Sequence, residues 1–308
     1  MSGAMHELFR HAALGVSLAA CLAAPSVAQD RGTPLAGALT GTLAKIATQD
    51  RITLGYREGS VPFSYLDASR RPIGYSVDLC LAVVSDVRAE LGREVAVDWV
   101  AVTPATRIPE LLAGRIDLEC GSTTSNAERE RQVAFSPIIF VAGTRLLVPR
   151  EAQVRSLADL AGRSVAVTAG TTNAEALEGL IRRQHLAINL VSVPEHMLGF
   201  ASLAAGRVEA FATDDVLLYG LIATQPGGDR FRVAGPLLSY EPYGLMFRRD
   251  DAAFADLVAR SFQRLAAGGD LRNLYDRWFT RRLPNGDRLN LPLSPQLAEL
   301  FRILGAPD

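Results

Sequence analysis

The chain has 308 residues and a formal net charge of −1 at pH 7, with 48% hydrophobic and 21% charged residues. A chain of this length is expected to form two domains or one large domain with an ample core, and its composition excludes a disordered or fibrous protein. The balanced charge argues against a general nucleic-acid binder and against a polybasic membrane binder. Four histidines and three scattered cysteines give no spacing typical of a metal site, so we expect neither a metal nor another cofactor.

Residues 1–28 have the pattern of a secretory signal peptide. An apolar run over residues 12–24 is followed by Ser26-Val27-Ala28, a small-x-small cleavage site. The run is short for a membrane span, so we expect export to the periplasm. Leu18-Ala19-Ala20-Cys21 also resembles a bacterial lipobox, in which Cys21 becomes the lipidated first residue. Ordinary cleavage and a lipoprotein anchor both stay open, and only such an anchor would attach the mature protein to a membrane.

The region after the cleavage site is rich in Gly, Ala and Thr, and we expect residues 29–42 to form a flexible leader. Two cysteines, Cys80 and Cys120, remain beyond it. Because an exported protein folds in an oxidising compartment, they are expected to form one disulfide, and two separately buried thiols are the alternative. No later stretch approaches about 20 apolar residues, so we expect the mature protein to be soluble.

Short apolar runs alternate with helical spacing along the rest of the chain. In the first part the pattern predicts strands and helices in the order strand 52–56, turn 67–72, helix 75–91, strand 95–100, helix 108–112 and strand 116–119. After about residue 143 it predicts strand 164–168, helix 172–184, strand 188–193, helix 196–205, strand 208–213, helix 216–224 and strand 231–234. The last part reads as a central strand 243–248, helices 252–267 and 271–279, and a final helix 296–304. This rhythm is typical of parallel sheets covered by helices, and it predicts two α/β lobes with a cleft between them.

In open α/β sheets ligands bind beyond the carboxyl ends of the strands, so polar residues at those ends are the site candidates. Gly121-Ser122-Thr123-Thr124 follows one short strand and can present hydroxyls and backbone N–H groups to an anion. Ser125 and Glu128 have capping-box spacing, which predicts that a helix begins there. Arg129 in that helix could hold a carboxylate in bidentate fashion. A helix cap with a solvated Arg129 is the alternative.

Each of the other candidate site residues also has a simple structural explanation. Thr172 follows Gly170-Thr171 at the head of a helix, where simple capping would explain it. Arg57, directly after a strand, could form a surface salt bridge. Arg107 begins a helix, where an i,i+3 pair with Glu110 is an alternative to a role in binding. A lone histidine such as His196 is more often structural, and capping alone would explain one of the adjacent residues Asp214 and Asp215.

Together these segments resemble one family, the extracytoplasmic amino-acid-binding proteins of ABC importers (solute-binding family 3), and most of all its glutamate/aspartate-binding branch. The resemblance covers about residues 48–282. The matching segments are Arg57-Glu58-x-Ser60-Val61-Pro62-Phe63-Ser64-Tyr65, Gly74-Tyr75-Ser76-x-Asp78, Glu119-Cys120-Gly121-Ser122-Thr123-Thr124, Glu128-Arg129, Ala134-Phe135-Ser136, Gly143-Thr144-Arg145-Leu146-Leu147, Gly170-Thr171-Thr172 and Asp214-Asp215.

The resemblance implies a periplasmic binding protein-like type II fold, with a ligand cleft between two α/β lobes. Lobe 1 would comprise residues 43–142 and 242–308, and lobe 2 residues 143–241. Two crossing segments, near 141–145 and 239–244, would form a hinge, and a ligand bound between the lobes would draw them closed.

The resemblance also implies roles for single residues. Arg129 would hold the ligand α-carboxylate, with Ser122 and Thr124 adding hydrogen bonds. The α-ammonium would go to Asp214. The side-chain carboxylate would contact Arg57, Arg107 and His196. Thr172 would form a hydrogen bond to the ligand from lobe 2. The family branch commonly has a serine where this chain has Pro104, which offers neither a hydroxyl nor an N–H, so one ligand contact is lost or replaced by water.

Charge arithmetic agrees with an acidic ligand. L-Glutamate or L-aspartate offers two carboxylates and one ammonium, whereas the implied site offers three arginines, one aspartate and a titratable histidine. A neutral ligand would leave Arg57 and Arg107 buried and unpaired, at a cost of several kcal/mol. The resemblance and this arginine surplus together lead us to expect L-glutamate or L-aspartate as the ligand. The resemblance further implies a monomeric, non-enzymatic binding protein that delivers the acid to separate permease subunits.

Two other functions stay open. One is an enzyme on the same fold, such as a cyclohexadienyl dehydratase-like lyase, for which Glu58 and Asp215 are the candidate bases. The other is a sensor subunit that presents a bound amino acid to a receptor.

Overall fold

The computed structural model of the protein describes residues 39–306. The predicted signal peptide, the lipidation candidate Cys21 and most of the predicted leader lie outside the described residues. Helix α1 spans Gly41–Gln49, so Gly41 and Thr42 belong to a helix rather than to the leader. The backbone N–H of Thr42 donates to Asp251 Oδ2 at 2.7 Å, and this bond ties the start of α1 to the head of a later helix.

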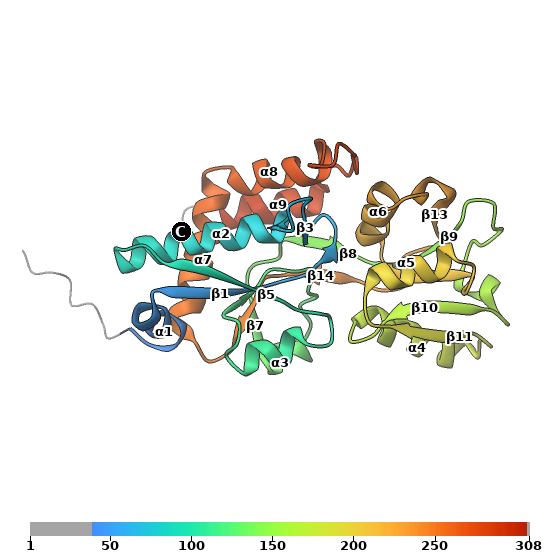
Figure 1. Cartoon of the computed structure of the whole chain (residues 1–308), viewed down its shortest axis with the longest axis horizontal. Helices are drawn as coiled ribbons and strands as arrows, with labels where there is room; N and C mark the ends of the chain where they lie inside the picture. The colour runs from blue at the N-terminus through green and yellow to red at the C-terminus, as the bar shows by residue number, and fades with distance from the viewer. Residues whose placement is uncertain (1–38, 307–308) are drawn as a thin grey trace, which may run out of the picture. The chain divides into compact units, whose positions relative to one another are not determined.

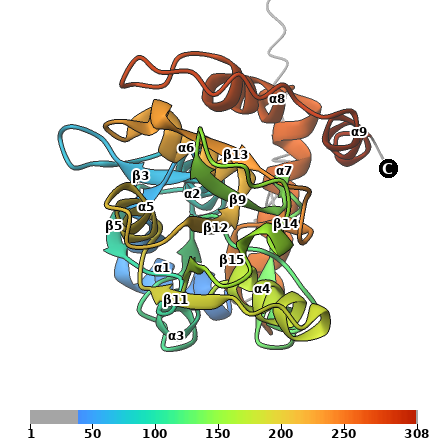
Figure 2. The same cartoon turned by 90° about the vertical axis from the view of Figure 1, so that its right-hand side faces the viewer.

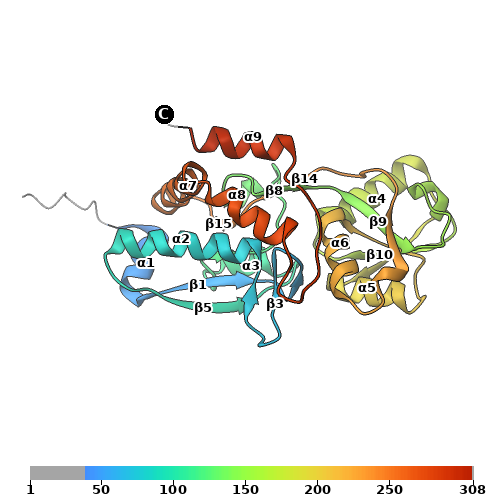
Figure 3. The ribbon, with the colours of Figure 1, turned by 90° about the horizontal axis from the view of Figure 1, so that it is seen from above.

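The first lobe is built on a five-stranded sheet with the order β5-β1-β6-β15-β7 (Figure 1). Strands β5, β1 and β6 are parallel, while β15 runs antiparallel to both β6 and β7. The strands are β1 (Arg51–Tyr56), β5 (Ala96–Ala101), β6 (Leu118–Glu119), β7 (Val133–Phe135) and β15 (Met246–Arg248). One face packs on α1, α2 (Tyr75–Leu91), α7 (Ala252–Ala267) and α8 (Asp270–Tyr275), and the other on α3 (Arg107–Leu112). The C-terminal helix α9 (Pro295–Leu304) lies against α7 (Figure 3).

The second lobe has its own five-stranded sheet with the order β11-β10-β12-β9-β13 (Figure 2). Its strands are β9 (Thr144–Pro149), β10 (Ser164–Thr168), β11 (Asn189–Val193), β12 (Ala210–Asp214) and β13 (Phe231–Ala234). Alternate residues of β10 face opposite sides, as strand geometry requires. Val165 and Val167 pack with α4 (Thr172–Gln184), and Ala166 packs with α5 (His196–Ala204) and α6 (Asp215–Thr224). The prediction of two α/β lobes is therefore confirmed.

Two short antiparallel strands carry the chain between the lobes. They are β8 (Phe140–Ala142) and β14 (Glu241–Tyr243), and their register pairs Glu241 with Ala142 and Tyr243 with Phe140. Phe63, from the segment between β2 (Gly59–Ser60) and β3 (Ser64–Leu66), packs edge-on against both aromatic rings at this crossing. Strand β3 also pairs with β4 (Pro72–Ile73). The crossing strands are thus fixed in the same apolar cluster as the first sheet.

The predicted central strand 243–248 is wrong as a single element. Tyr243 belongs to the crossing strand β14, and Met246 begins β15 in the first sheet. Between them Gly244 lies against Phe135 and Ser136, and the N–H of Leu245 donates to Ser136 Oγ at 2.9 Å. The apolar pattern runs through this bend because both strands are buried. The predicted helix 271–279 also ends early, because Asp276–Thr280 form a π-helical turn.

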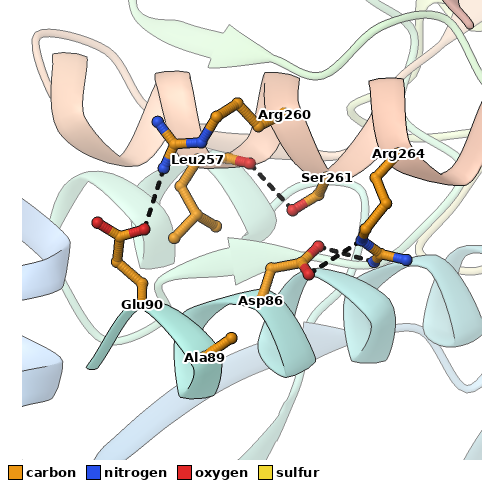
Figure 4. Close-up of a pocket in the computed structure, with 7 residues that line it drawn as sticks. All are labelled: Asp86, Ala89, Glu90, Leu257, Arg260, Ser261 and Arg264. Atoms are coloured by element: carbon orange, nitrogen blue, oxygen red, sulfur yellow. Dashed lines mark hydrogen bonds and ion pairs between the residues drawn. The ribbon is translucent and has the colours of Figure 1, made fainter. Parts of the chain in front are cut away.

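Outside the cleft, α2 and α7 are joined across a surface pocket by two ion pairs (Figure 4). Arg264 pairs with Asp86 at 2.8 Å and Arg260 with Glu90 at 3.2 Å. Exposed pairs of this kind contribute little to stability, so we assign this pocket no function. No helix within residues 39–306 has the length and apolar character needed to cross a bilayer.

Cys80 on α2 and Cys120 after β6 form a disulfide, with their Cα atoms 6.1 Å apart. The bond joins a helix of the first lobe to the loop that begins at Gly121. A cross-link of residues 40 apart in sequence removes conformational entropy from the unfolded chain, worth about 4 kcal/mol in the chain-entropy model.

We predict that reducing this disulfide lowers the free energy of unfolding by about 4 kcal/mol, measured by urea denaturation with and without reductant. Thiol titration of the denatured, unreduced mature chain is expected to find no free thiol. Two free thiols would show that Cys80 and Cys120 are separately buried instead.

Candidate ligand-binding site

The eight candidate residues lie at the boundary between the two lobes, at strand ends or helix starts. The first lobe contributes Arg57 after β1, Arg107 at the start of α3, and the loop that follows β6. The second lobe contributes residues at the starts of α4 and α5 and at the end of β12. Direct side-chain contacts cross the boundary: Arg57 Nη2 lies 2.6 Å from Glu195 Oε2, and the Thr124 and Thr172 hydroxyl oxygens are 3.4 Å apart. Glu241 on the crossing strand also accepts the hydroxyls of both threonines.

Arg57 is fully buried, so the alternative of a surface salt bridge is wrong. Its backbone N–H donates to Ser64 Oγ at 2.9 Å, which fixes the chain at the point where β1 ends. Its Nη2 donates to Glu195, which comes from the other lobe. Within the described residues, Arg57 Nε and Nη1 have no hydrogen-bond partner. Two buried N–H donors of one guanidinium are therefore available to a ligand.

Arg107 is also buried and does not pair with Glu110, which instead binds Arg115. Its Nη1 donates to Thr123 Oγ1 at 2.7 Å, and its Nε has no partner in the described part of the chain. Burial, reinforced by the charge of Arg129, lowers the pKa of Arg107 to about 9. The guanidinium is therefore still charged at neutral pH, although its surroundings disfavour that charge.

The loop after β6 differs in part from its prediction. Residues 129–131 form a single 3-10 turn, and the predicted capping box is wrong. Ser125 Oγ donates to Glu130 Oε1 at 2.5 Å, while Asn126 Oδ1 accepts the N–H of Arg129 and takes over the capping role. Arg129 is mostly buried and donates from Nη1 to the Thr124 carbonyl at 2.9 Å. Solvation of Arg129 is thereby excluded, and Ser122 Oγ is a further buried atom without a partner among the residues described.

In the second lobe, Thr171 caps α4 by accepting the N–H of Ala174. The neighbouring Thr172 hydroxyl is therefore not needed as a cap, and it donates to Glu241. His196 is buried at the start of α5, with Nδ1 2.9 Å from the Thr168 hydroxyl oxygen. Burial and the nearby Arg57 and Arg107 charges hold the pKa of His196 well below its usual value. His196 is therefore neutral at pH 7 and offers hydrogen bonding rather than the charge that a titratable histidine would supply.

Asp214 ends β12 and does not use its side chain as a helix cap. Its two carboxyl oxygens accept from Asn173 Nδ2 at 2.8 Å and from the Tyr243 hydroxyl at 2.5 Å. Burial and the neighbouring Glu241 carboxylate raise the pKa of Asp214 to about 7. The adjacent Asp215 accepts the N–H of Val216 instead, so the two aspartates have separate roles.

The site also contains three glutamates that were not among the sequence candidates. Glu119 accepts the Thr123 hydroxyl, Glu195 pairs with Arg57, and Glu241 accepts hydroxyls from Thr124 and Thr172. Glu119 ends the short strand before the Gly121–Thr124 loop, and this position is a usable sequence signal, because a buried carboxylate needs partners. Glu241 lies in the segment identified only as a hinge.

These groups sort into two kinds of chemistry. Unpartnered N–H and O–H donors are found on Arg57, Arg107 and Ser122, where an anion would satisfy them. One acceptor, Glu119 Oε1, is also buried without a partner among the described residues, and Glu119 is linked to Arg107 through the Thr123 hydroxyl. Carboxylates and hydroxyl oxygens gather around Asp214 and Glu241, where a cation would be accepted. Such an arrangement suits a small molecule that carries charges of both signs. Within residues 39–306 no cluster of three or more His, Cys, Asp or Glu side chains is placed to hold a metal ion.

The position of Pro104 bears on the boundary between the lobes. Gly170 adopts φ +71°, and the space beside its Cα is closed by the backbone of Pro104 and Ala105 from the first lobe. Glycine is required there both for the positive φ and for the close approach. Pro104 therefore lies at a contact between the lobes.

Residues 52–281 match the family described as bacterial extracellular solute-binding proteins, family 3. The chain belongs to this family. Its L-glutamate/L-aspartate-binding relative from Pseudomonas aeruginosa is 43% identical over 92% of both chains. The glutamate/aspartate import solute-binding protein of Escherichia coli is 38% identical over 92% of this chain and 94% of that protein.

Solved structures agree on the type II periplasmic binding protein fold. A mutant of ArgBP from T. maritima has a TM-score of 0.70 at 24% identity, covering 78% of this chain and 99% of that one. An ancestral amino acid-binding protein, described as a precursor of cyclohexadienyl dehydratase, has a TM-score of 0.68 at 24% identity, over 77% and 99%. At these identities the likeness concerns the fold alone.

The raised pKa of Asp214 gives a stability prediction. In the unfolded chain this carboxyl has its usual pKa of 3.8, and in the folded protein its pKa is raised to about 7. The contribution of Asp214 to the free energy of unfolding is therefore fully present below about pH 4 and is lost as the pH rises towards 7. The difference between these two pKa values corresponds to a loss of up to roughly 4 kcal/mol. Urea denaturation across this range is expected to show the unfolding free energy of the protein falling relative to that of Asp214→Asn.

The control is Asp229→Asn, which alters an exposed carboxylate outside the site. Its pH profile is expected to run parallel to that of the unmodified protein. A parallel profile for Asp214→Asn would instead mean that Asp214 ionises normally in the folded state.

Proposed function

We propose that this protein captures L-glutamate or L-aspartate between its two lobes outside the cytoplasm and delivers it to the membrane permease of an ABC importer. The observation that carries the proposal is the set of buried, unpartnered donors on Arg57, Arg107 and Ser122. The glutamate/aspartate-binding relatives from P. aeruginosa and E. coli support the same ligand class.

The unpaired N–H groups of Arg57 and Arg107 favour a ligand with an acidic side chain. The donors of Arg57 and Arg107 lie on one side of the site, and the only charged partner of Arg57 among the described residues is Glu195. A side-chain carboxylate would accept from both guanidinium groups. A neutral side chain would leave at least part of them buried without a partner, at several kcal/mol. A basic side chain would add repulsion.

The polar groups of the site are assigned to the two carboxylates and the ammonium group of the ligand as follows. Arg129 and Ser122 bind the α-carboxylate, and Asp214 binds the α-ammonium. The side-chain carboxylate is held by Arg57 and Arg107, with a neutral hydrogen bond from His196. Thr124 and Thr172 contact the ligand from the first and the second lobe. Because these groups come from both lobes, a bound ligand favours the closed arrangement by its differential contacts.

A carrier fits the structure better than an enzyme. Of the two candidate bases, Glu58 has a side chain that is 57% exposed and pairs loosely with Arg70, and Asp215 is engaged by backbone N–H groups. We propose that the chain has no catalytic residue, acts as a monomer, and reaches the periplasm through the signal peptide 1–28, cleaved after Ala28 or lipidated at Cys21.

Calorimetric titration of the refolded mature chain, from Gln29 onward, tests the proposed ligand. L-Glutamate and L-aspartate are expected to bind with micromolar or tighter affinity, stoichiometry near one, and no product formed. L-Glutamine and L-arginine are expected to bind much more weakly, because each leaves Arg57 and Arg107 unpaired or repelled. If neither acid gave a binding signal and another amino acid did, the ligand assignment would be overturned. Turnover of a bound acid would overturn the carrier assignment.

Arginine substitutions test the assignment of the carboxylates. Arg129→Ala is expected to weaken every amino acid by roughly 30-fold or more, because each carries an α-carboxylate. Arg57→Ala and Arg107→Ala are expected to weaken L-glutamate much more than L-glutamine. The matched control is Arg51→Ala, an exposed arginine that begins β1, the strand that Arg57 follows, and pairs with Asp98. Equal losses for the two ligands would place Arg57 and Arg107 outside the side-chain pocket.

A further inference from the structure

We propose that Glu241 is a ligand-positioning residue: its carboxylate orients the Thr124 and Thr172 hydroxyls so that their oxygens, together with Asp214, form the subsite for the ligand ammonium. The inference deepens the proposed function and rests on it. It assigns a binding role to the strand that crosses between the lobes.

Glu241 lies at the junction of three parts of the molecule. Only 2% of the residue is exposed. Its Oε2 accepts the hydroxyl of Thr124 from the first lobe at 2.7 Å and that of Thr172 from the second lobe at 2.5 Å. Its Oε1 accepts the hydroxyl of Ser239, two residues back along the chain, at 2.5 Å. The carboxylate thus has three hydroxyl donors and is well satisfied.

The direction of these bonds decides what the threonines can offer. A hydroxyl has one hydrogen and two lone pairs, and an ionised carboxylate can only accept. The hydrogens of Thr124 and Thr172 are therefore committed to Glu241, and their oxygens present lone pairs. They cannot donate to a ligand carboxylate while these bonds persist. The donor that a bound amino acid offers at neutral pH is its ammonium group, so the ammonium is the group that this pair accepts.

The charges around the threonines agree with this assignment. Tyr243, two residues after Glu241 on β14, donates to Asp214, which places both carboxylates beside the same strand. The charge of Glu241 contributes to the raised pKa of Asp214. Two carboxyl groups this close disfavour joint ionisation, and an ammonium between them and the hydroxyl oxygens relieves the repulsion. The roles that the family resemblance gave Thr124 at the α-carboxylate are revised accordingly.

The test is Glu241→Gln, which keeps the side-chain volume and removes the charge. Affinities for L-glutamate and for glutarate, which has the same two carboxylates without the ammonium, are compared by calorimetry. We expect L-glutamate to weaken tenfold or more and glutarate to bind equally or more tightly. A merely structural role would weaken both ligands alike. Ser239→Ala is the matched control, because it removes a partner of Glu241 that does not contact the ligand, and we expect less than a threefold effect.

A second measurement decides the case where glutarate binds too weakly to quantify. Thr172→Val removes the hydroxyl and is combined with Glu241→Gln in a double-mutant cycle on L-glutamate. Thr172→Val is expected to lower the affinity for L-glutamate in both backgrounds. The factor by which it does so in the Glu241→Gln protein is expected to be at least threefold smaller than in the unmodified protein. Additive losses, an unchanged affinity in Glu241→Gln, or equal losses for L-glutamate and glutarate would overturn the inference. Failure of the unmodified protein to bind L-glutamate would instead refute the proposed function, and the two failures are thereby distinguished.

Discussion

The burial of three arginine guanidinium groups at the boundary between two sheets is the constraint on which the rest of the site depends. Arg57, Arg107 and Arg129 are each less than one-tenth exposed. Removing such charges from water costs several kcal/mol each unless they are paired. The structure meets this cost with carboxylates drawn from both lobes: Glu195 pairs with Arg57. Arg129 is stabilised by the charges of four further carboxylates, which are Glu175, Glu241, Glu119 and Asp214. The polar groups of the two lobes are therefore mutually dependent.

The crossing strands hold this arrangement in register. Strand β14 carries Glu241 and Tyr243 on alternate positions, and each makes a hydrogen bond to a site residue. The same Tyr243 ring packs against Phe63, which belongs to the segment that follows Arg57. A shift of the crossing strands by one residue would turn Glu241 and Tyr243 away from the site together. The connection between the lobes is therefore also part of the binding surface, rather than only a pair of linkers.

Local sequence signals predicted the elements that have clear ends. The helices over 75–91, 172–184 and 252–267 and the strand over 164–168 match the structure, because apolar periodicity stops at Gly or Pro or at a capping residue. The bend at Gly244 was missed because the residues beside it, Tyr243 and residues 245–247, are all apolar and buried. The predicted capping box failed because Asn126, one residue later, caps the turn by accepting the N–H of Arg129, while Ser125 donates to Glu130. The partners of Glu195 and Glu241 depend on contacts between segments distant in sequence, which no local pattern reports.

The sequence suggested an acidic ligand from a surplus of arginine charge, and the structure changes that reasoning. Three arginines face Glu119, Glu195 and Glu241, while His196 is neutral and Asp214 ionises only near neutral pH. The site therefore has little net positive charge to attract an acid. What remains is a set of unpartnered N–H groups on Arg57 and Arg107 and, apart from it, a set of hydroxyl oxygens and carboxylates around Asp214 and Glu241. Selection would then depend on how well each ligand atom is paired, so that a ligand of correct net charge but without an ammonium would leave the Asp214 and Glu241 set unsatisfied.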